Sequence, residues 1–176
     1  EGRPLRSATR GLLRGLDYLH TRSPPVVHRD IKAANVLVSL NFCVKLADFG
    51  CSKRSAVTRS FTTLGSIPWM APEVMHQKDG YGRKADIWSL GCTLLEMATA
   101  EKPWGNAVFE NIMYAMKHIG LSDATPPLPV SLCGKGRSFA GRCTRRTPEE
   151  RPSAARLLRH GFMREPAAET AGEAGC

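Results

Sequence analysis

Three short strings in the first half of the chain hold side chains that could act together in catalysis. The strings are 28–35 (HRDIKAAN), 48–50 (DFG) and 71–73 (APE). The carboxylate of Asp30 could take the proton of an attacking hydroxyl, and Lys32 could neutralise a phosphate. Asn35 and Asp48 offer the oxygen atoms that Mg²⁺ prefers. These groups suit phosphoryl transfer, which needs charge neutralisation and alignment more than covalent chemistry.

Two β-rich runs lie between the first and second strings and must position these side chains. The runs are 36–38 and 43–46, and the turn between them predicts a β-hairpin. We expect this hairpin to bring Asp30 and Asp48 to opposite sides of one cleft. The alternative for each aspartate is surface turn chemistry, which would be the better interpretation if either stood alone.

Apolar residues at helical spacing predict the remaining elements. The predicted helices cover 7–20, 84–100 and 107–119, and Ser153 is a good N-cap for a short one at 154–159. The helix at 84–100 is strongly apolar, which predicts that it is buried. The sequence therefore predicts an α+β fold that is mostly helical, with one small β element near its start.

Composition and charge narrow the class of protein. The chain has 176 residues, of which 42% are hydrophobic and 23% charged, as in one globular domain, and this excludes collagen, coiled coil and wholesale disorder. Its apolar runs are too short to span a bilayer, so no membrane partner is expected. The net charge of +9 favours anionic partners. A nucleic-acid-binding domain would rest on this charge alone, so we interpret the charge as a solvated basic face and expect no nucleic-acid partner.

The six cysteines include no C-x-x-C pair. This spacing argues against a zinc site or a redox motif, and a chain of this size does not need disulfides. We therefore expect reduced thiols and a cytoplasmic location, with the nucleus as an alternative.

Longer runs around the three strings carry a resemblance to a known family. They are 44–53 (VKLADFGCSK), 65–74 (GSIPWMAPEV), 84–92 (KADIWSLGC), 150–154 (ERPSA) and 157–160 (LLRH). Together they resemble the C-terminal lobe of a serine/threonine protein kinase, most closely the MAP kinase kinase kinase branch of the sterile-twenty-like group. The resemblance implies a partial kinase domain, the C-lobe, over 1–164 and a disordered tail over 165–176. The stretch 128–142 fits the family pattern poorly.

The resemblance also implies roles for the residues of the candidate site. Asp30 would be the catalytic base, and Lys32 and Asn35 would support the phosphate and the second metal ion. Asp48 would bind metal, and Leu37 would form the floor of the adenine pocket. The implied cofactors are ATP and Mg²⁺.

A second group of residues would support the site structurally. The group comprises His28, Arg29, Phe49, Gly50, Ser66, Glu73, Asp86 and Arg151. Within it, Asp86 would tether the backbone of the catalytic loop, and Ser66 would face that loop. Glu73 and Arg151 would form a buried ion pair, which is costly to break from one side.

The segment between the second and third strings resembles a kinase activation loop. A phosphate on this loop would pair with Arg29 and order it. The candidate phosphosites are Thr58, Ser60, Thr62 and Thr63, with Thr62 or Thr63 favoured because they are near Gly65. The alternative is that the loop is merely polar.

Two parts of a complete kinase site are expected but not found in the sequence. There is no G-x-G-x-x-G loop and no V-A-I-K-like strand, so we expect the N-lobe to be absent from this chain. The chain alone should then bind ATP weakly and be inactive. Since residue 1 is Glu rather than Met, the sequence is expected to be a fragment.

Two hypotheses for function follow. The first is a MAP kinase kinase kinase-like enzyme that transfers the ATP γ-phosphate to Ser or Thr of a protein, which we expect to be a downstream MAP kinase kinase. The alternative is a catalytically inert, kinase-derived protein-interaction module.

Overall fold

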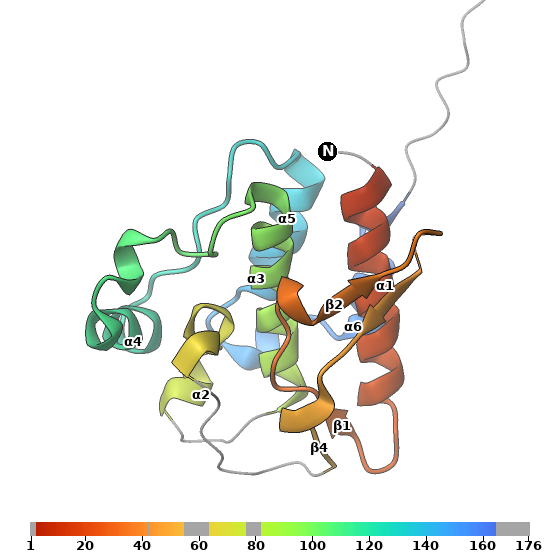
Figure 1. The fold of residues 1–176 in the computed structure, drawn as a ribbon, viewed down its shortest axis with the longest axis horizontal. Coiled ribbons are helices and arrows are strands. Elements are labelled where there is room, and N and C mark those ends of the chain that lie inside the picture. Colours follow the sequence, from red (N-terminus) through yellow and green to blue (C-terminus); the bar gives the residue numbers. More distant parts are fainter. Residues whose placement is uncertain (1–2, 42, 55–63, 77–81, 165–176) are drawn as a thin grey trace, which may run out of the picture.

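The computed structural model describes residues 3–41, 43–54, 64–76 and 82–164 (Figure 1). The described part is mostly helical, with short strands near the start of the chain. The candidate phosphosites Thr58, Ser60, Thr62 and Thr63 lie outside the described residues, as does the predicted tail at 165–176.

Two antiparallel strand pairs form next to the catalytic loop. Strand β2 (Val36–Val38) pairs with β3 (Val44–Leu46), with Leu37 opposite Lys45, and this confirms the predicted hairpin. Strand β1 (Val26–Val27) pairs with β4 (Lys53–Arg54). The second pair was not predicted, because two-residue strands leave too short an alternating pattern to recognise.

The described residues contain six α-helices. They are α1 (Arg3–His20), α2 (Pro72–His76), α3 (Arg83–Thr99), α4 (Ile112–Leu121), α5 (Gly134–Cys143) and α6 (Ala154–Leu157). None of them is both long and apolar enough to span a bilayer. The single helix predicted over 107–119 is wrong. Residues Ala107–Phe109 form a 3₁₀ turn, and α4 begins only at Ile112, because the Asn111 side chain accepts hydrogen bonds from the next backbone N–H groups and caps the helix.

Helix α3 lies in the middle of the fold and packs against α1 and α5 (Figure 1). Every residue from Ala85 to Leu95 is buried, as predicted from its apolar composition. Leu12 and Leu16 of α1 join Leu94 of α3 and Phe139 of α5 in one apolar cluster. Since α3 has so little solvent-facing surface, its polar side chains point into the protein and can anchor other segments.

Gly91 sets how closely α3 approaches α5. In Gly91→Ala, the new Cβ would lie 2.7 Å from the Cys143 Cβ, an atom that can move only with the backbone of α5. We expect the free energy of unfolding to fall by about 1–3 kcal/mol because the two helices must separate. Urea unfolding followed by circular dichroism measures this loss.

Gly15→Ala is the matched control, because its new Cβ would meet no atom within 4 Å. This change should stabilise α1 by about 0.5–1 kcal/mol through helix propensity. If both alanine substitutions changed the free energy of unfolding by the same amount, the inference that Gly91 allows α3 to pack closely against α5 would be wrong.

Candidate active site

The buried carboxylate of Asp86 fixes the backbone of the catalytic loop. Its Oδ2 accepts a hydrogen bond from the His28 N–H, and its Oδ1 accepts one from the Arg29 N–H, both at 2.9 Å. Arg29 has a φ of 76°, in the left-handed region that non-glycine residues seldom adopt. Asp86 therefore holds the strained residue that comes directly before Asp30, which is the tether that the family resemblance implied.

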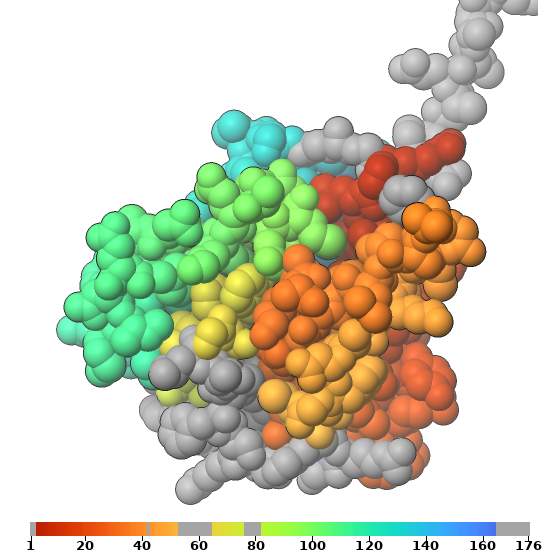
Figure 2. Space-filling view, in the orientation of Figure 1, coloured from red at the N-terminus to blue at the C-terminus, as the bar shows by residue number. Residues whose placement is uncertain are grey.

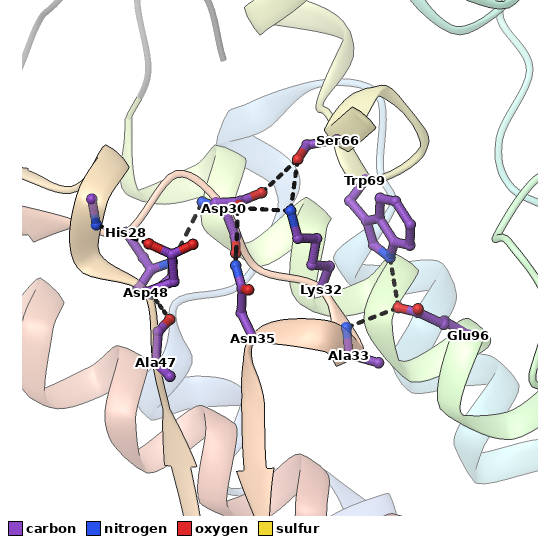
Figure 3. Close-up of polar contacts among 11 residues, drawn as sticks. His28, Asp30, Lys32, Ala33, Asn35, Ala47, Asp48, Ser66, Trp69 and Glu96 are labelled. Carbon is purple, nitrogen blue, oxygen red and sulfur yellow. Dashed lines mark hydrogen bonds and ion pairs between the residues drawn. The ribbon is translucent and has the colours of Figure 1, made fainter. Parts of the chain in front are cut away.

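Three side chains converge on the carboxylate of Asp30 (Figure 3). Lys32 Nζ donates to Oδ2 at 2.8 Å, and Asn35 Nδ2 donates to the same oxygen at 2.9 Å. Ser66 Oγ donates to Oδ1 at 2.7 Å and accepts from Lys32 Nζ at 3.0 Å. The structure thus brings together four residues that the sequence analysis had grouped from two separate segments.

The surroundings of Asp30 keep its carboxylate ionised. Burial would by itself raise its pKa, but hydrogen bonds from Lys32, Ser66 and Asn35 outweigh burial and lower the pKa below the ordinary value. The side chain of Asp30 is 6% exposed. An ionised carboxylate held in one orientation can accept a proton from a hydroxyl placed against it.

Asn35 and Asp48 are the two residues with candidate metal-binding oxygens, and both are drawn with Asp30 in Figure 3. The backbone carbonyl of Asn35 accepts a hydrogen bond from the Ala47 N–H at 2.8 Å, and His28 Nε2 lies 3.1 Å from the backbone oxygen of Ala47. The residue before Asp48 is therefore held at both of its backbone groups. The Nδ2 of Asn35 is used by Asp30, so its amide oxygen is the atom that would face a metal. The exposed carboxylate of Asp48 and the amide oxygen of Asn35 are ligands of the kind that fits Mg²⁺, which also keeps water and phosphate ligands.

His28 and Phe49, which flank the candidate metal residues in the sequence, form a ring contact. Their ring centroids are 5.0 Å apart in an edge-on arrangement. Burial lowers the pKa of His28, since the charged form loses hydration, and the ring is therefore neutral at neutral pH. This geometry agrees with a role in packing rather than in proton transfer.

Leu37 lies on the surface of the hairpin together with other apolar side chains. Leu37, Val38 and Phe49 are each about half exposed, at 58%, 52% and 47%. Figure 2 shows the hairpin segments, in orange, on the face of the molecule that is turned toward the viewer. Leu37 is thus accessible to a ligand, and its assignment to an adenine pocket stays a prediction.

Glu73 and Arg151 form the ion pair that the resemblance implied. The two guanidinium NH groups donate to the two carboxylate oxygens at 2.6 and 2.8 Å. Arg151 is fully buried, and it also donates to the carbonyls of Lys84, Arg145 and Arg146. The pair joins α2, which begins within the third string, to the loop before α6. Arg29 is also buried, and its pairing with an activation-loop phosphate stays a prediction, since the candidate phosphosites lie outside the described residues.

Two residues near the site were missed by the sequence analysis. His20 Nε2 lies 2.8 Å from Asp86 Oδ2, so Asp86 has a third partner. Glu96 Oε2 accepts from the Ala33 N–H at 2.9 Å and from the Trp69 indole N–H at 2.8 Å. Both residues contact partners far away in the chain, and no local pattern indicates such contacts.

Arg146 was missed as well, and it fixes helix α4. Its guanidinium donates to the carbonyls of Ile119 and Gly120 in the last turn of α4 and to that of Ala124 beyond it. Side-chain donors of this kind commonly bind the last carbonyls of a helix. The sequence analysis had interpreted the positive charge as a solvated basic face and had assigned no role to Arg146.

The family model for the protein kinase domain matches residues 1–163. The chain belongs to this family, and its mostly helical structure agrees with the C-lobe of a kinase.

The similar proteins define the type more closely. The chain is 45% identical over 157 residues to mitogen-activated protein kinase kinase kinase A of Dictyostelium discoideum, covering 88% of this chain and 16% of that protein. It is 47% identical to mitogen-activated protein kinase kinase kinase 3 of Arabidopsis thaliana, covering 91% of this chain and 26% of that protein. It is 45% identical to mitogen-activated protein kinase kinase kinase YODA of the same plant, and the match covers 91% of this chain and 18% of that protein. The chain is therefore similar to part of several mitogen-activated protein kinase kinase kinases, and it spans about a quarter or less of the length of these relatives.

Arg151→Ala should cause a large loss of stability. The change leaves the Glu73 carboxylate without its cation and removes one donor from each of three carbonyls, so we expect the free energy of unfolding to fall by about 3–5 kcal/mol. Arg145→Ala is the control, because its pair with Glu150 is exposed and should contribute less than about 1 kcal/mol. Urea unfolding of both variants checks this, and a loss below about 1 kcal/mol for Arg151→Ala would contradict the assignment.

Proposed function

We propose that this chain forms the catalytic-loop half of a serine/threonine protein kinase of the MAP kinase kinase kinase type. The observation that carries the proposal is the ionised, buried carboxylate of Asp30, which is held by hydrogen bonds from Lys32, Asn35 and Ser66. The proposed reaction transfers the γ-phosphate of ATP to a Ser or Thr hydroxyl of a protein, with Mg²⁺ as the metal.

Each residue of the network has a part in the proposed reaction. Asp30 would orient the substrate hydroxyl and accept its proton as the new oxygen–phosphorus bond forms and the bond to the ADP oxygen breaks. Lys32 would neutralise charge on the transferred phosphoryl group, and Ser66 would hold Lys32 and Asp30 in place. Asn35 and Asp48 would hold Mg²⁺, which when bound neutralises charge on the phosphates.

A downstream MAP kinase kinase is the proposed protein substrate. The support for this choice is the similarity to relatives named as mitogen-activated protein kinase kinase kinases. The alternative of an inert interaction module is not favoured, because Asp30, Lys32, Asn35 and Asp48 are all present and three of them form one hydrogen-bonded network.

Asp30→Asn tests the proposed base. Asparagine preserves the shape of the side chain but cannot accept the proton, so we expect kcat to fall on the order of 10²–10⁴-fold while KM for ATP changes little. The assay uses the full-length protein that contains this chain, radiolabelled ATP and a purified MAP kinase kinase. Asp17→Asn on α1 is the control and should retain wild-type kcat. If Asp30→Asn kept a third or more of the activity, the proposed function would be wrong.

Asp48→Asn tests the metal site separately from the base. Loss of the carboxylate charge weakens Mg²⁺ binding, so we expect the Mg²⁺ concentration for half-maximal activity to rise at least about tenfold. Excess Mg²⁺ should restore part of the activity of Asp48→Asn but none of the activity of Asp30→Asn. An unchanged Mg²⁺ dependence in Asp48→Asn would contradict its role as a ligand.

A further inference from the structure

Glu96, near the end of α3, joins two segments that meet at the candidate site (Figure 3). A single oxygen, Oε2, accepts both the Ala33 N–H at 2.9 Å and the Trp69 indole N–H at 2.8 Å. Ala33 follows Lys32 in the catalytic loop. Trp69 ends the 3₁₀ helix η3 (Leu64–Trp69), which also carries Ser66.

The contacts of Glu96 close a ring around the candidate site. At one end, Ser66 of η3 bonds to Asp30 and Lys32. At the other end, Trp69 of η3 bonds to Glu96, which bonds back to the residue after Lys32. The segment η3 and the catalytic loop are therefore connected twice, once directly and once through α3.

Helix α3 is a rigid frame for this connection. Besides Glu96, Ser89 of the same helix donates to the carbonyl of Trp69 at 2.7 Å. Trp69 is thus fixed through both its backbone and its ring to a helix whose preceding turns are entirely buried. Movement of η3 relative to the catalytic loop requires that at least one of these bonds break.

The two N–H groups that donate to Glu96 have few alternative acceptors. The Ala33 N–H opens the 3₁₀ helix η1 (Ala33–Asn35), and the first N–H groups of a helix have no partner within it. The Trp69 side chain is largely buried, and a buried indole N–H needs an acceptor. Removal of the Glu96 carboxylate would leave both donors unsatisfied.

We propose that Glu96 is a positioning residue, which acts through Trp69 and Ala33 to keep Ser66 and Lys32 aligned on Asp30. The inference rests on the proposed function, because it concerns the geometry of the same site. Small displacements of positioned groups can lower the rate of catalysis strongly. The nucleotide contacts are not touched by Glu96, so its loss should lower kcat and leave KM for ATP nearly unchanged.

The test compares Glu96→Ala, Glu96→Gln and the control Glu101→Ala in the full-length protein. We expect Glu96→Ala to lower kcat at least about tenfold with KM for ATP within about twofold of wild type. Glu96→Gln should keep most of the activity, because its amide oxygen can accept both hydrogen bonds. Glu101 has an exposed side chain, and Glu101→Ala should behave as wild type. A kcat for Glu96→Ala within twofold of wild type would overturn the proposal, as would an equal loss in Glu96→Gln.

Trp69→Phe provides a second variant, which keeps an aromatic side chain at this position and removes the indole N–H together with part of the ring volume. If Glu96 acts through Trp69, Glu96→Ala should lower kcat several-fold less in the Trp69→Phe background than in wild type. If the factors by which Glu96→Ala and Trp69→Phe lower kcat simply multiply in the double variant, Glu96 does not act through Trp69.

Hydrogen–deuterium exchange separates this proposal from the proposed function. Peptides that cover 28–36 and 64–70 should both exchange at least about tenfold faster in Glu96→Ala, and at the wild-type rate in Glu101→Ala. If the wild-type protein transfers no phosphate, the proposed function fails, and faster exchange in both peptides still supports the positioning by Glu96. Unchanged exchange in either peptide overturns the positioning whatever the activity.

Discussion

A carboxylate buried without solvent contact is the constraint on which the site depends. Asp86 is fully buried, and a charge in that position is tolerated only where hydrogen bonds replace its hydration. The replacements come from His20 and from the backbone N–H groups of His28 and Arg29. Because these N–H groups point at one oxygen pair, the loop has one way to turn, and that turn delivers Asp30 to the cleft. The need to satisfy one charge thereby sets the place of another.

Helix α3, which carries Asp86, also anchors other segments around the site. Asp86 holds the start of the catalytic loop, Glu96 holds its middle, and Ser89 holds the end of η3. Lys84 supplies a carbonyl to Arg151, whose partner Glu73 lies on α2. Polar side chains on a buried helix are expensive unless they are paired, and here each pairing attaches a segment that would otherwise have few contacts with the core.

The sequence alone was sufficient for residues whose identity is dictated by chemistry or by local pattern. The three strings predicted the grouping of Asp30, Lys32 and Asn35, and the β-rich runs predicted the hairpin. Helix α5 was not predicted, since Gly134, Gly136 and Gly141 weaken the helical pattern and burial of one face compensates for them. His20, Glu96 and Arg146 escaped notice for a different reason. Their roles arise from partners distant in the chain, such as Asp86, 66 positions from His20, and only the tertiary structure brings these together.

The loop between α5 and α6 has a consequence for how the chain tolerates change. Arg146 donates hydrogen bonds to the end of α4, and Arg151, five positions later, donates to Glu73 of α2. Each guanidinium also depends on main-chain carbonyls at fixed places, and α2 packs against α4. A deletion or insertion between the two arginines would move one of them away from the helix that it binds, even if the new side chains were polar. Over residues 147–150, the number of residues therefore matters more than their identity.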